Sequence, residues 1–181
     1  IGVPFPSTEI RVVDPEDPST ERARGERGEL LIRGPQVFSG YWQQPDETAR
    51  VLLADGWLRT GDVVEVDDDG FVTIVDRIKE LIITGGFNVY PSEVEAALRT
   101  VDGVLDAAAV GMPNSSGGEE VVAVVVAEEG VVLDPDAVRQ ASREHLTGYK
   151  VPRRVVVVEE LPRSLIGKVL HRQVRDDLLA R

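Results

Sequence analysis

The residue pattern of this chain changes at Asp76, and this change constrains the possible fold more than any other feature. Before it, residues 63–66 and 71–75 are largely apolar and flank Asp67-Asp68-Asp69-Gly70, where the Asp-Gly pair predicts a hairpin turn. After it, apolar runs of strand length alternate with helical patterns. The sequence therefore predicts an α+β protein with a β-rich first part.

The second part contains recognisable helix and strand patterns. Ser92 and Glu95 have the spacing of a capping box, which predicts that a helix begins there. The continuous apolar runs 107–110 and 121–127 predict strands that are covered on at least one face. Apolar residues recur at helical spacing in 170–179, which predicts a terminal helix. These elements predict a compact domain of about 100 residues.

Composition limits the class of protein. The formal net charge of −12 argues against a general binder of nucleic acid or of anionic membranes. The absence of cysteine excludes disulfides, thiolate nucleophiles and Cys-based zinc sites within this sequence. No secretion signal or membrane-spanning apolar run is present. We therefore expect a cytoplasmic protein, with peripheral membrane association left open.

Lysine is rare in this sequence, and the positions where it occurs are candidates for a specific role. Lys and Arg together number 20, yet the only lysines are Lys79, Lys150 and Lys168. A chain that uses Arg almost everywhere could retain Lys where a compact, mobile ammonium is needed. Chance placement is the alternative for each of them.

Two segments near the change of pattern have both a structural and a chemical interpretation. Gly61-Asp62 is a simple turn or, alternatively, presents a carboxylate whose paired oxygens accept the hydroxyls of a ribose diol. Residues 76–80 are a charged linker or a hinge between domains.

Two later segments raise the same question. Gly85-Gly86 before Phe87 is a strand-to-helix turn that needs positive φ, or a place where the backbone closely approaches a thin ligand. Gly167-Lys168 ends a proline-bearing loop before the last helix. Lys168 is either a surface residue or an ammonium delivered to an anionic centre.

Together and in this order, the segments resemble the carboxy-terminal portion of the adenylate-forming superfamily of acyl-CoA synthetases, luciferases and peptide-synthetase adenylation domains. The resemblance covers nearly the whole chain and is strongest to bacterial long-chain fatty-acid CoA ligases. The matching segments are residues 34–37 with 40–42, then 56–62, 75–80, 86–95, 146–152 and 161–170.

The resemblance implies a two-step reaction in which a fatty acid and ATP form an acyl-adenylate, and CoA then displaces AMP. It implies that Asp62 and Arg77 bind the nucleotide ribose and that Lys79 is the hinge. It also implies that Lys168 is the catalytic lysine of adenylation. ATP with Mg²⁺ and CoA are substrates of the complete enzyme, and no tightly bound cofactor or metal ligand is expected in this chain.

The resemblance also implies a CoA channel and a domain organisation. Gly85, Gly86 and Phe87 are expected to line the pantetheine channel, and Lys150 is assigned near bound nucleotide or CoA. Residues 1–75 are expected to belong to the large adenylation domain and 76–79 to the hinge. Residues 80–181 are expected to form a mobile lid with a mixed sheet and flanking helices.

Two departures from the family pattern affect these expectations. Ile166 stands where many members have Thr or Ser before the Gly-Lys pair, which long-chain ligases tolerate. The phosphate loop, the adenine-contacting motif and the acyl tunnel would lie upstream. We therefore expect this chain to be part of a longer enzyme and inactive by itself. It could self-associate through the surface that contacts the rest of the large domain.

Two other functions remain open at this stage. One is a non-catalytic module that binds nucleotide or CoA or docks to a partner, and the other is the lid of a carrier-protein-loading adenylase. His145 and His171 receive no catalytic role, and Trp42 and Trp57 are assigned to packing. The length of the acyl chain cannot be read from these residues.

Overall fold

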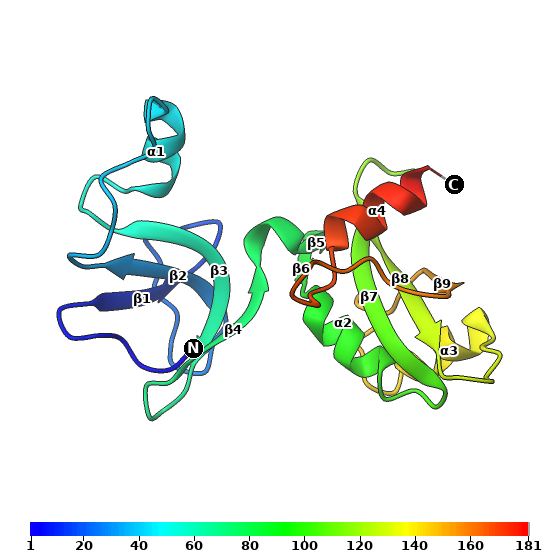
Figure 1. Ribbon diagram of the computed structural model, residues 1–181. Coiled ribbons are helices and arrows are strands. Elements are labelled where there is room, and N and C mark those ends of the chain that lie inside the picture. Colours follow the sequence, from blue (N-terminus) through cyan, green and yellow to red (C-terminus); the bar gives the residue numbers. More distant parts are fainter. Residues whose placement is uncertain (181) are drawn as a thin grey trace. The chain divides into compact units, whose positions relative to one another are not determined.

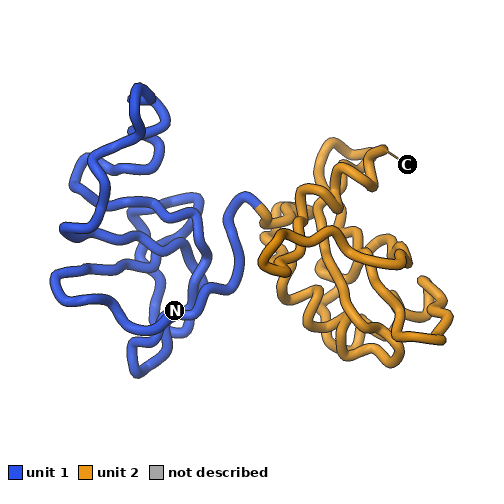
Figure 2. Tube along the Cα trace, viewed as in Figure 1, with its two compact units in different colours: residues 1–79 blue, residues 80–181 orange. Residues whose placement is uncertain are grey.

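The computed structural model describes residues 1–180 and divides into two compact units. The first unit is Ile1–Lys79 and the second is Glu80–Arg181 (Figure 2). Among the described residues, no helix has the length and apolar character needed to cross a membrane.

The first unit is built on a four-stranded antiparallel sheet (Figure 1). Its strands follow chain order: β1 (Glu9–Val13), β2 (Gly28–Arg33), β3 (Leu58–Val66) and β4 (Val72–Arg77). A short helix, α1 (Pro45–Val51), lies in the connection from β2 to β3, and Pro at its start suits the first helical turn. The predicted hairpin is confirmed as the β3–β4 pair.

Alternation along the strands gives this sheet two small apolar clusters. Val13, Leu31 and Trp57 form one cluster, and Leu30, Val64 and Val72 form the other. Neighbouring Leu30 and Leu31 belong to different clusters because successive strand residues point to opposite faces. The packing role assigned to Trp57 agrees with its 2% exposure, whereas the same assignment for Trp42 is wrong because its side chain is 86% exposed.

The second unit combines a hairpin, a mixed sheet and three helices (Figure 1). The three-stranded sheet has the order β7-β8-β9, in which β7–β8 is antiparallel and β8–β9 is parallel. The predicted α+β fold with a mixed sheet and flanking helices is therefore confirmed. The 3₁₀ turn η1 (Ile78–Glu80) spans the boundary between the two units. The elements of the second unit are β5 (Ile82–Thr84), β6 (Phe87–Val89), α2 (Pro91–Leu98), β7 (Val104–Pro113), β8 (Glu119–Ala127), α3 (Pro135–Ser142), β9 (Arg154–Val158) and α4 (His171–Leu179).

Helices cover both faces of this sheet. Ala107 and Ala109 of β7 pack in the cluster that also contains apolar residues of α2 and α3. Ala108, between them, packs in a separate cluster with Val174 and Leu178 of α4. The continuous apolar runs of β7 and β8 thus have a direct cause, because both faces of the sheet are buried.

Two local predictions for this unit are wrong. Helix α2 begins at Pro91, so Ser92 lies inside the first turn and no side-chain cap forms; the Glu95 carboxylate is directed to other partners. Gly85-Gly86 is not a strand-to-helix turn but the two-residue turn of the β5–β6 hairpin. Both glycines have positive φ, +59° and +82°, as a type I′ hairpin turn requires.

Candidate functional site

Asp62 lies in a bulge of β3 opposite β2, and a second irregularity, in β4, alters its pairing on the other side. Arg59 is opposite Leu31 and Val63 is opposite Glu29, so the intervening residues of β3 share Leu30 as their counterpart. Gly61 has φ of +70°, a conformation that glycine adopts without strain. Bulges of this kind redirect side chains and occur often beside active sites.

An extra residue in β4, Val75, selects the partner of Asp62 on that strand. The pairs nearer the turn, such as Val64 with Ile74, would continue to place Asp76 opposite Asp62. The register instead shifts by one residue between Val63 and Val64, and Asp62 lies opposite Arg77. The shift therefore replaces a pair of carboxylates with a carboxylate and a guanidinium.

In the Asp62–Arg77 pair, one carboxylate oxygen of Asp62 remains available as a hydrogen-bond acceptor. Arg77 Nε is 3.0 Å from Asp62 Oδ1, and the Asp62 side chain is 17% exposed. The approach lacks hydrogen-bond geometry, and within residues 1–180 the buried Oδ1 has no hydrogen-bond donor. Buried polar atoms are usually satisfied, so an orphaned carboxylate oxygen is a place where a ligand hydroxyl could donate.

Glu29 holds the strand segment that precedes Asp62. Its side chain is 2% exposed, and Arg59 donates to it from Nε and Nη2 at 2.9 and 2.6 Å. The same carboxylate accepts from the Gly61 amide at 3.3 Å. The Thr60 hydroxyl donates to the Leu30 carbonyl at 2.8 Å. These contacts fix the backbone immediately beside Asp62.

Arg77 and Lys79 line a common pocket of about 350 Å³ in the first unit. Arg59, Thr60 and Gly61 also contribute to its wall. Lys79 lies in the 3₁₀ turn η1 and is exposed. The predicted ribose-binding arginine and the predicted hinge lysine therefore share one basic pocket in a strongly acidic chain.

The residues predicted for the CoA channel gather in the second unit. The rings of Phe87 and Tyr149 stack with centroids 4.7 Å apart, and Lys150 Nζ is 5.7 Å from the centroid of the Tyr149 ring. Gly85 and Gly86 border open space. Lys150 also donates to both oxygens of Glu93, at 2.7 and 2.8 Å, so its charge already has a partner within the unit.

Lys168 is exposed at the end of a tight turn between β9 and α4. The Ser164 amide donates to the Lys168 carbonyl at 2.8 Å, and the Lys168 amide donates to Ser164 Oγ at 3.1 Å. Gly167 has φ of +81°, which allows the turn to close. No described carboxylate lies within ion-pair distance of Lys168, so its ammonium is available to a ligand.

The structure brings some predicted residues together and leaves others in separate units. Asp62 and Arg77 meet in the first unit, and Phe87 and Lys150 meet around Tyr149 in the second. Sequence reasoning missed Glu29 and assigned Glu95 to a helix cap, because no local pattern indicates that these carboxylates are only 1% and 7% exposed. It also assigned no role to His171, which contacts Glu95.

Two family models match the chain. The model of the AMP-binding enzyme C-terminal domain matches residues 93–168, and that of the AMP-binding enzyme matches residues 1–42. The chain belongs to the AMP-binding enzyme family. The two matches lie one in each unit, and the region between them, residues 43–92, runs from just before α1 to the first turn of α2.

Similar proteins include bacterial acyl-CoA ligases. A long-chain-fatty-acid–CoA ligase of Salmonella typhimurium is 51% identical over 177 residues, which cover 98% of this chain and 31% of that enzyme. The chain thus spans about a third of the length of such curated relatives.

Solved structures of MatB from Rhodopseudomonas palustris also match, and each match covers 98% of this chain and 35% of the MatB chain. The ATP-bound structure matches with a TM-score of 0.90 at 39% identity. The apo structure of the same enzyme matches with a TM-score of 0.66 at 40% identity.

Proposed function

We propose that the full-length protein carrying this chain is a long-chain fatty-acid CoA ligase. In this proposal the chain contributes the ribose-binding side of the adenylation domain, the hinge and the mobile lid. The observation that carries it is the buried, donor-free Oδ1 of Asp62 beside Arg77. Both residues lie in a chain that is 51% identical to a long-chain-fatty-acid–CoA ligase over 177 residues.

Asp62 and Arg77 have complementary roles in nucleotide binding. The Asp62 carboxylate accepts hydroxyl hydrogens from the ribose, which supply the donor that Oδ1 lacks. Arg77, with its side chain 54% exposed, neutralises this carboxylate and can contact the same sugar. The Glu29 contacts keep the bulge in place, so the carboxylate is oriented before the nucleotide arrives.

Lys79 is the pivot about which the second unit moves in this proposal. It lies in a single 3₁₀ turn, which connects β4 of the first unit to β5 of the second. The two MatB matches support the proposal. Over the same 98% of this chain, the TM-score is 0.90 for the ATP-bound structure and 0.66 for the apo structure, a difference that a movement between two units would produce.

Lys168 acts in the first half-reaction. A carboxylate oxygen of the fatty acid attacks the α-phosphorus of ATP, the bond to pyrophosphate breaks, and negative charge develops on the phosphoryl oxygens. The Lys168 ammonium stabilises that charge and withdraws before the second step. Mg²⁺ would offset the charge of the phosphates. No cluster of three or more His, Cys, Asp or Glu among residues 1–180 is placed to hold it, so we assign it no ligand here.

CoA reacts in the second half-reaction. Its thiolate attacks the acyl carbonyl, and the acyl–phosphate bond breaks to release AMP. The glycine turn Gly85-Gly86 offers a wall without side chains for the narrow pantetheine arm, with the exposed Phe87 at its edge. In this proposal Lys150 has a structural role: through its contacts it holds Tyr149 and Glu93 beside the channel. The reaction would take place in the cytoplasm, where ATP and CoA are available.

Separate assays of the two half-reactions test the proposal. In the full-length protein, Lys168→Ala should lower palmitate-dependent ATP–pyrophosphate exchange by about 10²–10³-fold. Thioester formation from supplied palmitoyl-adenylate should remain near the unmodified rate. The control is Arg172→Ala, which removes a positive charge from a side chain of the same unit that is 96% exposed. An equal loss in both half-reactions would contradict the assignment of Lys168, and absence of exchange in the unmodified protein would contradict the activity.

A further inference from the structure

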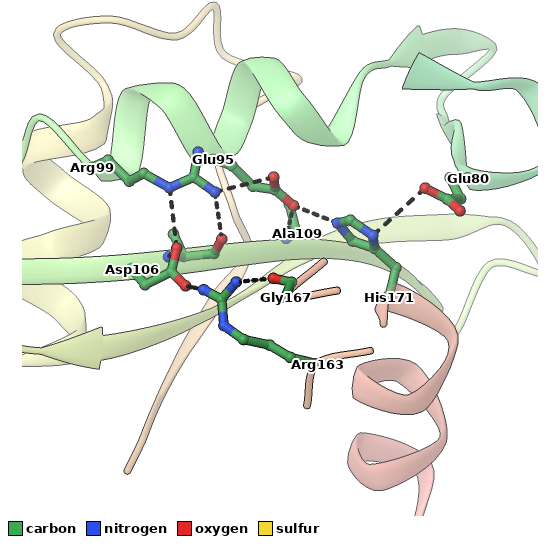
Figure 3. Close-up of polar contacts among 9 residues, drawn as sticks. Glu80, Glu95, Arg99, Asp106, Ala109, Arg163, Gly167 and His171 are labelled. Atoms are coloured by element: carbon green, nitrogen blue, oxygen red, sulfur yellow. Dashed lines mark hydrogen bonds and ion pairs between the residues drawn. The ribbon is translucent and has the colours of Figure 1, made fainter. Parts of the chain in front are cut away.

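The segment that carries Lys168 is attached by polar contacts at its beginning (Figure 3). Arg163 donates from Nη1 to the carbonyl of Gly167, the residue before Lys168, and from Nη2 to Asp106 Oδ2 on β7. A single guanidinium therefore links the backbone beside Lys168 to a strand of the sheet. Arginine suits this position because its planar, multiple donors reach two acceptors at once.

Asp106 is itself held in place. Its Oδ1 accepts from Arg99 Nε at 3.2 Å and from the Ala107 amide at 2.8 Å. Arg99 also donates to the Ala107 carbonyl at 3.0 Å and lies 3.4 Å from Glu95. We call Glu95, Arg99 and Asp106 the α2–β7 platform, after the elements that carry them.

The end of the segment reaches the same platform. His171, the first residue of α4, lies 2.6 Å from Glu95 Oε1 through Nε2 and 3.5 Å from Glu80 through Nδ1 (Figure 3). Glu95 Oε1 also accepts from the Ala109 amide at 3.0 Å. Both ends of residues 163–171 are thus attached to one connected polar group, in which Glu95 is buried.

Apolar packing does not hold the tip of this segment. Leu165 and Ile166 are 108% and 78% exposed, and the turn closes through backbone hydrogen bonds, Ser164 and the Arg163 bond to Gly167. On one side the orientation of Lys168 relative to the sheet depends on the Arg163 contacts. On the other side it depends on Val169, which packs against the apolar cluster of α4 and the sheet, and on His171. A polar attachment of this kind fixes direction where burial cannot.

We propose that Arg163 is a positioning residue that orients Lys168 for adenylation by bridging Gly167 to the α2–β7 platform. The inference rests on the proposed function, because it assigns Arg163 a role only in the half-reaction that uses Lys168. Loss of the bridge frees the turn, and a displacement of about 1 Å at a reacting centre can cost up to about 10²-fold in rate.

The test uses Arg163→Ala in the full-length protein. We expect palmitate-dependent ATP–pyrophosphate exchange to fall about tenfold, less than for Lys168→Ala because the ammonium remains present. Thioester formation from supplied palmitoyl-adenylate should stay unchanged. Arg175→Ala is the matched control: its side chain is 42% exposed against 47% for Arg163, and it forms an ion pair, with Glu119 at 3.4 Å, that does not touch the turn.

A second variant separates positioning from folding. Arg163→Lys keeps the charge but cannot bridge both acceptors with the same geometry, so exchange should lie between those of Arg163→Ala and the unmodified protein. Unchanged exchange in Arg163→Ala, or an equal loss in both half-reactions, would overturn the inference while Lys168→Ala keeps its selective effect. If Lys168→Ala also lacks a selective effect, the proposed function is overturned as well.

Discussion

Each unit contains a buried glutamate near its candidate site, but the two are held differently. Glu29 in the first unit depends on one guanidinium, that of Arg59, and on the Gly61 amide. Glu95 in the second unit contacts Arg99, His171 and the Ala109 amide, which belong to three different elements. The first glutamate stiffens one short strand segment beside Asp62, whereas the second joins a helix, a strand and the segment that carries Lys168.

The largest expected effect tests this difference directly. Arg59→Ala should lower the free energy of unfolding of the first unit by about 3–5 kcal/mol, because it leaves the Glu29 carboxylate buried without its cation. Arg99→Ala should cost about 1–3 kcal/mol, since Glu95 keeps the Ala109 amide and His171. Urea unfolding followed by amide hydrogen exchange would assign each loss to its unit. Equal losses would remove the contrast between the two glutamates.

The next effect concerns the apolar cores. Leu98 is fully buried in the large cluster beneath α2, and Leu31 is 2% exposed in a cluster that contains only two other buried residues. Both substitutions to Ala fall within the usual range of about 2–5 kcal/mol, and we expect Leu98→Ala near the top and Leu31→Ala near the bottom. The Leu31 site can relax toward solvent, whereas the Leu98 site is closed by packed neighbours. A larger loss for Leu31→Ala in the same unfolding measurement would reverse this ranking.

Trp57 offers a smaller test within the first unit. The Arg11 and Arg33 guanidinium carbons lie 4.5 and 4.7 Å from its ring centroid, and its buried Nε1 has no hydrogen-bond partner among the described residues. Trp57→Phe should therefore cost less than about 1.5 kcal/mol, because the lost N–H made no hydrogen bond and an aromatic face remains. A cost above 3 kcal/mol in equilibrium unfolding would mean that the indole is needed for its full volume.

The smallest effect is a dependence on pH in the first unit. The hydrogen bond from Arg33, followed by the charges of Arg33 and Arg11, lowers the pKa of Glu9 below its ordinary value of 4.5. A carboxyl with a lowered pKa stabilises the folded state above its ordinary pKa, and that contribution is lost as pH falls through the lowered value. In Arg33→Gln, NMR titration should find the pKa of Glu9 close to 4.5. An unchanged low pKa would rule out Arg33 as the cause.

Much of the fold follows from apolar patterns in the sequence. The runs in β7 and β8 are long and uninterrupted because both sheet faces are covered, and the Asp-Gly turn determines the β3–β4 hairpin. The β5–β6 hairpin was missed because its strands have only three residues each, too short for an alternating pattern to stand out. The capping box was misread since Pro91 starts the helix one residue earlier.

The candidate site is less predictable than the fold. A regular hairpin would place Asp76 opposite Asp62, and only the register shift at Val63 brings Arg77 there. Such a shift depends on one extra residue in β4, Val75, which no local pattern marks. The roles of Arg163 and Glu95 depend likewise on contacts between elements that lie far apart along the chain.

The parallel pairing of β8 with β9 has a consequence for how the protein acquires its structure. β7 and β8 are joined by a short turn and can pair early, whereas β9 must wait for the chain through α3 to cross over and return. Contacts between distant residues form late because the intervening chain must first be ordered. Since residues 163–171 follow β9, Lys168 should be among the last groups of its unit to reach its native surroundings during synthesis and refolding.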